Sequence, residues 1–114
     1  MNNKLKLPLP KDKKLEVFFR VESGCLGPQG EEHVNDFCTS AQKEVDVIDA
    51  DFVHWNIIPR HDKKLPEMEY KLNNKKLTHD KAAKYLSFFD KNLDEFEGHL
   101  HDKLALLIDE YLGH

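Results

Sequence analysis

The strongest pattern in this sequence is a run of apolar residues near its C-terminal end, spaced three and four residues apart. The run lies within residues 79–112 and consists of Ala82, Leu86, Phe89, Leu93, Phe96, Leu100, Leu104, Leu107 and Tyr111. Near-heptad spacing of this kind places the apolar side chains on one face of an α-helix. The sequence therefore predicts a long C-terminal helical region, with Thr78 as its N-cap.

This helical region is too long to lie wholly on one small body. A continuous helix over these residues would be about 51 Å long, whereas a compact chain of 114 residues is roughly 34 Å across. Either the helix breaks or part of it overhangs. Asn92 and Glu95 resemble a capping box, and Gly98 is a second weak point, so we favour a broken or kinked helix.

An apolar helix face that the chain does not cover predicts association. Such a face buries its surface most readily against a second copy of the same helix. We therefore expect a homodimer that forms through Leu100, Leu104, Leu107, Ile108 and Tyr111. The alternative is that the last helix folds back on the sheet of its own chain, in which case the protein is monomeric.

The residues upstream show strand and helix patterns in turn. Alternation of apolar and polar residues predicts strands at 15–22, 52–58 and 67–72, and a short fourth strand at 75–77. Apolar residues at helical spacing predict a helix over 31–47. The expected fold class is α+β, with a small three- to four-stranded sheet in β-α-β-β order that packs on one helix and precedes the C-terminal helical region.

The connections predict how the strands pair. A helix separates the first two strands, so these two are expected to be parallel neighbours joined by a right-handed crossover. A loop at 59–66 separates the second and third strands, and these two are expected to pair antiparallel through it.

The two ends of the chain differ in composition. Lysines and prolines dominate residues 1–14, which predicts a flexible basic tail, whereas residues 15–114 fit a single α+β domain. No apolar run is long enough to span a membrane, and the N-terminal apolar stretch is too short for a signal peptide. We therefore expect a cytoplasmic protein without membrane contact, in which Cys25 and Cys38 are free thiols.

Charge is segregated into four blocks along the chain. Residues 1–20 carry six bases and two acids, residues 21–59 one base and eight acids, residues 60–84 eight bases and four acids, and residues 85–114 two bases and seven acids. Such blocks can attract one another within a fold or between subunits, or form solvated faces. The net charge of −4 and the isoelectric point of about 5.9 disfavour nucleic-acid binding.

Cys25 is the residue of greatest chemical interest. It lies between Gly24 and Gly27 in a glycine-rich turn that leads from a strand into a helix. Such turns expose backbone N–H groups, and a helix N-terminus stabilises a nearby thiolate. The turn could therefore hold an anion or a reactive thiol, with His33 or His54 as a base.

No spacing in the sequence predicts a metal or cofactor site. It contains no Cys-x-x-Cys or His-x-x-x-His pair and no phosphate-binding glycine motif, so we expect neither a metal nor a cofactor. The leading interpretation is a small non-catalytic protein-interaction module, which self-associates through its C-terminal helices and presents a sheet or basic hairpin to an unidentified protein partner. The alternative is a thiol-dependent enzyme or a small anionic-ligand binder that uses the turn around Cys25. The predicted binding residues are Gly24 and Gly27 in the turn around Cys25, and Arg60, Lys63 and Lys64 in the basic stretch near the hairpin.

Overall fold

The computed structural model describes residues 6–113 and contains four strands, three α-helices and two short 3₁₀ turns (η1 and η2) in that range. In chain order these are η1 (Lys11–Lys13), β1 (Leu15–Val21), η2 (Ser23–Leu26), α1 (Gly30–Val45), β2 (Val53–Pro59), β3 (Met68–Leu72), β4 (Lys75–Leu77), α2 (His79–Ser87) and α3 (Leu93–Leu112). The predicted α+β class, the short fourth strand and the break in the C-terminal helical region are all confirmed.

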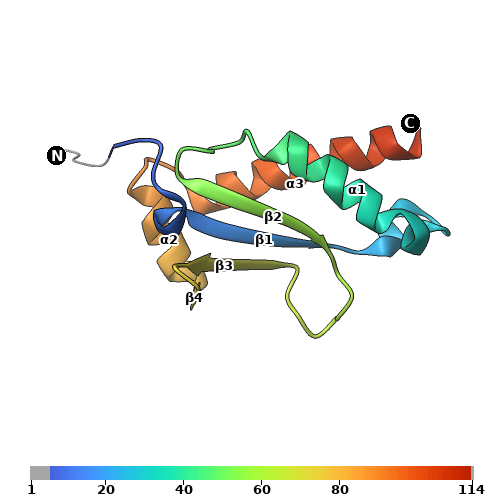
Figure 1. Ribbon diagram of the computed structural model, residues 1–114, viewed down its shortest axis with the longest axis horizontal. Helices are drawn as coiled ribbons and strands as arrows, with labels where there is room; N and C mark the ends of the chain where they lie inside the picture. Colours follow the sequence, from blue (N-terminus) through green and yellow to red (C-terminus); the bar gives the residue numbers. More distant parts are fainter. Residues whose placement is uncertain (1–5, 114) are drawn as a thin grey trace.

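β1 is an inner strand of a sheet whose order is β2–β1–β3–β4 (Figure 1). Val17 of β1 lies opposite Trp55 in a parallel pairing with β2, and opposite Tyr70 in an antiparallel pairing with β3. The predicted parallel neighbours are thus confirmed. The predicted pairing of the second and third strands is wrong, because β1 lies between them. One face of β1 carries Leu15, Val17, Phe19 and Val21, which are buried, and the other carries Glu16, Phe18 and Arg20.

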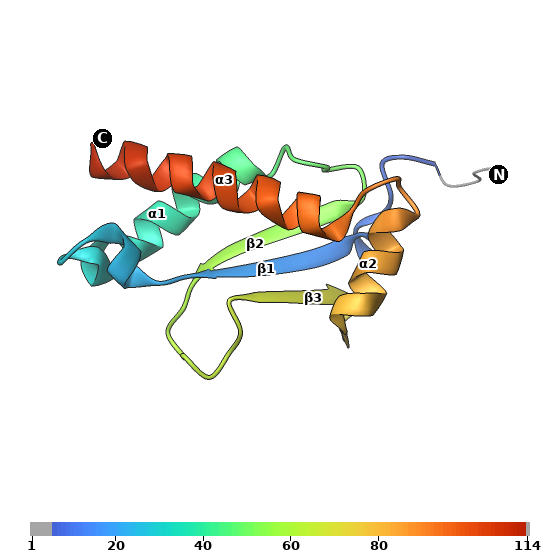
Figure 2. The ribbon, with the colours of Figure 1, turned by 180° about the vertical axis from the view of Figure 1, so that it is seen from behind.

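α1 and α3 cover the same face of the sheet, which makes a two-layer structure (Figures 1 and 2). Alternate side chains of β1, including Leu15 and Val17, point into this layer and are fully buried. The indole ring of Trp55 stacks on Phe96 of α3 with ring centroids 5.1 Å apart, and its N–H donates to the carbonyl of Ile48 at 2.7 Å. The buried face of the sheet therefore fixes the position of α3.

The break between α2 and α3 lies where the sequence predicts it. The side-chain oxygen of Asn92 accepts a hydrogen bond from the Glu95 N–H at 3.1 Å, and Thr78 caps α2 in the same way through the Lys81 N–H at 3.2 Å. Asp90, with a φ of 60°, turns the chain out of α2. α3 then continues without interruption through Gly98, so that glycine does not break the helix.

The segment before β1 packs against the body from Leu9 onward. Leu9 is buried, and its N–H donates to the carbonyl of Asp51 at 2.8 Å. The hydroxyl of Tyr85 on α2 accepts from the Leu15 N–H at 3.2 Å and lies 2.9 Å from the carbonyl of Phe52. Of the tail predicted for residues 1–14, residues 1–5 lie outside the described residues. The part from Leu9 onward is held by these contacts.

Candidate functional site

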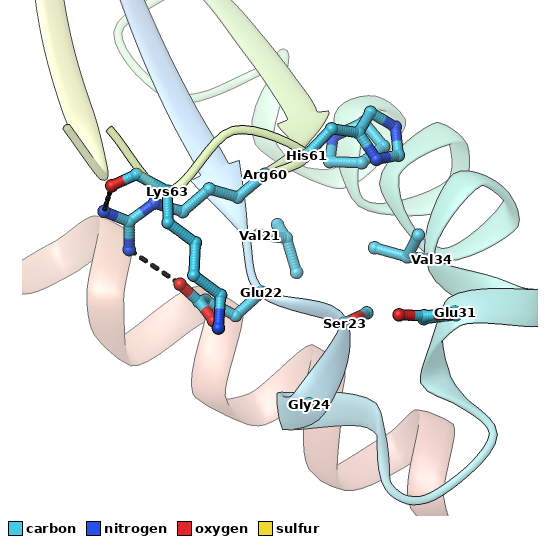
Figure 3. Close-up of a pocket in the computed structure, with 10 residues that line it drawn as sticks. Val21, Glu22, Ser23, Gly24, Glu31, Val34, Arg60, His61 and Lys63 are labelled. Carbon is cyan, nitrogen blue, oxygen red and sulfur yellow. Dashed lines mark hydrogen bonds and ion pairs between the residues drawn. The ribbon is translucent and has the colours of Figure 1, made fainter. Parts of the chain in front are cut away.

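A cavity of about 530 Å³ opens at the carboxyl ends of the parallel strands β1 and β2 (Figure 3). Val21 and Val34 supply apolar surface, while Glu31 and Lys63 lie on opposite sides. The carboxyl ends of parallel strands are where open sheets commonly bind ligands, because the loops that follow the strands converge there. The position of this cavity makes it the first candidate for a ligand-binding or catalytic site.

Arg60, a predicted binding residue in this cavity, is occupied by contacts within the chain. Its guanidinium donates to the carboxylate of Glu22 at 2.7 Å and to the carbonyl of Leu65 at 2.9 Å, and its backbone N–H donates to the carbonyl of Val21 at 2.8 Å. Figure 3 shows the side chain turned toward Glu22. Arg60 thus fastens the loop after β2 to the end of β1, which leaves its charge neutralised.

The other predicted binding residues are only partly brought together. Gly24 and Lys63 line the same cavity as Arg60, although they come from segments far apart in the sequence. Gly27 lines a neighbouring hollow, and the backbone N–H of Lys64 donates to the side chain of Asp62 in the loop. Two carboxylates and two cations surround the cavity, so its electrostatics do not select an anion.

The three candidate catalytic residues lie in different places. Cys25 is exposed in η2, whereas His33 on α1 packs against the ring of Tyr111 with centroids 6.1 Å apart. His54 pairs in register with Glu16 and lies on the sheet face opposite the helices, where its Nδ1 is buried without a hydrogen-bond partner. A base on the far face of the sheet cannot serve a thiol in η2, so this arrangement does not support the combination of Cys25 with His54.

The second thiol is part of the core. Cys38 is buried on the inner face of α1, and its burial raises the pKa of the thiol to about 11. Neither cysteine forms a disulfide. Cys38 therefore behaves as a small apolar residue at neutral pH.

The apolar face predicted for dimerisation is divided between core and surface. Leu100 and Leu104 are 0% and 3% exposed within a single chain, so they have no surface left for a second copy. Leu107 and Ile108 are partly buried against the same core, and Tyr111 contacts the edge of Phe37 with ring centroids 5.7 Å apart. The dimer contact predicted at Leu100 and Leu104 needs correction, because the break near Asn92 lets α3 fold back on its own sheet.

A second hollow, of about 420 Å³, lies at the other end of the molecule and is mostly apolar. We call it the aromatic hollow; it is lined by Leu9, Leu72, Tyr85, Phe88 and Phe89, together with Asp12, Lys13 and Asn73. Phe88 is 67% exposed. Sequence reasoning missed this site because the helical spacing selects Phe89 for the core and says nothing of its neighbour Phe88.

Lys13 lines the aromatic hollow, and other lysines lie on the segments near it. They come from three segments that meet at this end of the molecule, namely η1, β4 and α2 (Figure 1). We call Lys11, Lys13, Lys75, Lys76 and Lys84 the basic rim; all five are exposed. The fold thus gathers lysines from two basic blocks of the sequence at the end of the molecule that holds the aromatic hollow.

The described residues contain no group of three or more His, Cys, Asp or Glu side chains placed to hold a metal ion. Within residues 6–113, no helix combines the length and the apolar character needed to cross a membrane. In the comparisons with known proteins, no family model, no curated protein and no solved structure matches this chain. Its function therefore has to be inferred from its own surfaces.

Proposed function

We propose that the protein is a small non-catalytic binding module, which uses the aromatic hollow to bind an acidic, apolar segment of a protein partner. The observation that carries this proposal is the 67% exposure of Phe88 inside an apolar hollow. A phenylalanine left in water beside other apolar side chains is a common feature of protein-binding surfaces.

Phe88 lies at the edge of a group of packed aromatic rings. It meets Phe89 edge-on with ring centroids 5.7 Å apart, and Phe89 stacks on Phe52 at 4.4 Å with the two ring planes 2° apart. Tyr85 completes the group, 5.3 Å from Phe89. An exposed phenylalanine beside a packed aromatic platform offers a continuous apolar contact surface, which favours its use as an interface anchor.

The basic rim indicates the charge of the partner. Lysines around an apolar contact attract an acidic surface and increase the rate of encounter, while they disfavour basic partners. The same region also carries the exposed acids Asp12, Asp80 and Asp90, and the five lysines of the basic rim outnumber them. A segment with apolar side chains flanked by Asp or Glu is therefore the best match.

The edges of the sheet favour this surface over strand addition. β4 is only three residues long and contains two lysines, and the outer edge of β2 is blocked by a side chain of α1.

The free thiols of Cys25 and Cys38 keep the cytoplasm as the expected location. The enzyme alternative receives less support, because Cys25 and His54 do not meet.

The proposal is tested with a fluorescein-labelled synthetic helix that carries leucines on one face and glutamates on the other. We expect the full chain to bind this peptide, and Phe88→Ser to weaken binding by about tenfold or more. Val47→Ser is the matched control, since Val47 is 77% exposed but lies outside the hollow. A peptide with lysines in place of the glutamates should bind more weakly. Equal binding by wild type and Phe88→Ser, or no binding of the acidic peptide, would contradict the proposal.

A further inference from the structure

We infer that the acidic apolar segment is supplied by a second copy of this chain, which docks the last turns of α3 on the aromatic hollow. This inference rests on the proposed function, because it names the partner of the same hollow. It replaces the symmetric contact through α3 that the sequence suggests with a head-to-tail contact between unlike ends.

The last turns of α3 keep apolar surface that their own chain does not cover. Tyr111 is 40% exposed and Leu112 39%. Tyr111 is fixed by its edge contact with Phe37, and Leu112 lies beside Gly27 at the end of η2. These side chains are therefore ordered and still able to bury more area.

The surroundings of these side chains are acidic. We call this region the acidic tip; it comprises Tyr111 and Leu112 together with the acids Glu31, Glu32, Asp36 and Glu110. The last turn of α3 contains no base, and a helix C-terminus itself carries partial negative charge. Glu31 and Glu32 come from the first turn of α1, which lies at the same end of the molecule (Figure 1). The tip thus combines apolar contact area with a negative rim.

Charge decides which ends can meet. Two acidic tips brought together in a symmetric dimer would place carboxylates of both copies around one apolar contact, and like charges at an interface are costly. The same tip against the aromatic hollow places those carboxylates near the lysines of the basic rim. Complementary charge therefore favours the contact between unlike ends.

The shape of the molecule allows every copy to use both ends. The described chain measures 51 × 28 × 23 Å, and Figures 1 and 2 place the C-terminus of α3 at one end of the long axis and α2 with β4 at the other. A head-to-tail contact between opposite ends leaves one free end on each outer copy. Association should therefore proceed beyond a dimer to open chains as concentration rises.

Two variants, each altered at one end, test the inference. Phe88→Ser removes the anchor of the hollow and Leu112→Ser alters the acidic tip, and both residues are exposed enough for the fold to tolerate the change. We expect each variant alone to self-associate about tenfold more weakly than wild type. A mixture of the two should form a species of twice 13.3 kDa, because one copy keeps an intact tip and the other an intact hollow. Val47→Ser should associate like wild type.

The outcomes separate this inference from the proposed function. A mixture that stays at 13.3 kDa while wild type associates would show a symmetric or unrelated contact and would overturn the head-to-tail arrangement. A wild type that stays monomeric but binds the leucine–glutamate peptide would overturn self-association and leave the binding module intact. A wild type that does neither would overturn both.

Discussion

The side-chain amide of Gln42 on α1 donates a 2.7 Å hydrogen bond to the backbone carbonyl of Trp55 on the outer edge of β2. Its oxygen accepts from the N–H of Ile57, also at 2.7 Å, so one side chain satisfies the two groups that a neighbouring strand would otherwise bind. Pro59 has no N–H to offer at the end of the same edge. The sheet is thereby closed to strand addition at this edge, which directs association toward side-chain surfaces.

Gln42→Ala should lower the free energy of unfolding by about 1–3 kcal/mol, because it leaves two backbone groups of β2 without their partner. Urea denaturation measures the change. Gln29→Ala is the matched control, since Gln29 is exposed and its side chain caps nothing. A loss at Gln42 no larger than that at Gln29 would show that the edge contact does not contribute to stability.

Asn92→Ala should destabilise the protein by about 1 kcal/mol, because the start of α3 loses the side-chain oxygen that accepts from the Glu95 N–H. Asn92→Asp keeps that oxygen and should retain most of the wild-type stability. Thermal or urea unfolding of the two variants measures the difference. If both variants unfold alike, the break between α2 and α3 does not depend on this cap.

Leu104→Ala should destabilise the isolated chain by about 2–5 kcal/mol, as expected for a buried leucine, while Leu106→Ala should stay within about 0.5 kcal/mol. The two residues lie on the same helix but are 3% and 52% exposed. Unfolding is measured in dilute solution, where association does not contribute. A small loss at Leu104 would mean that α3 is not packed on its own sheet as described.

Stability should fall as pH rises above about 9. Burial raises the pKa of Cys38 from 9.0 to about 11 and that of Tyr85 from 10.0 to about 12. The folded state then keeps protons that the unfolded state loses, so the free energy of unfolding decreases with pH through this window. Cys38→Ala should show a shallower decrease between pH 9 and pH 11, the range of the Cys38 shift. Ser40→Ala, at an exposed site on the same helix, should keep the wild-type slope, and identical slopes for all three proteins would contradict this account.

Local pattern predicted most of the elements. The alternation in β1 and β2, the helical spacing in α1, and the cap at Asn92 depend on neighbouring residues, and the structure confirms each of them. The pairing of strands could not be obtained in this way. Proximity along the chain favoured a hairpin between β2 and β3, but β1 takes the position between them.

The surfaces were harder to predict than the core. Phe88 and Phe89 are adjacent and chemically identical. The helical spacing selects Phe89 for the core, where it packs on Phe52, but it does not predict that Phe88 lies exposed in an apolar hollow. Leu9 lies in a lysine-rich segment that predicts an exposed tail. It is buried instead, and its N–H donates to the carbonyl of Asp51, which is distant in the sequence. The acidic tip and the basic rim likewise arise only when the fold brings separate charge blocks to opposite ends.

Sedimentation equilibrium of the wild-type chain over a series of concentrations, at low and at high salt, tests the central claim most directly. We predict that the average mass exceeds 13.3 kDa and rises with concentration at low salt, and that it falls back when salt screens the charges of the two ends. A mass of 13.3 kDa at every concentration in both salts would contradict self-association through unlike ends.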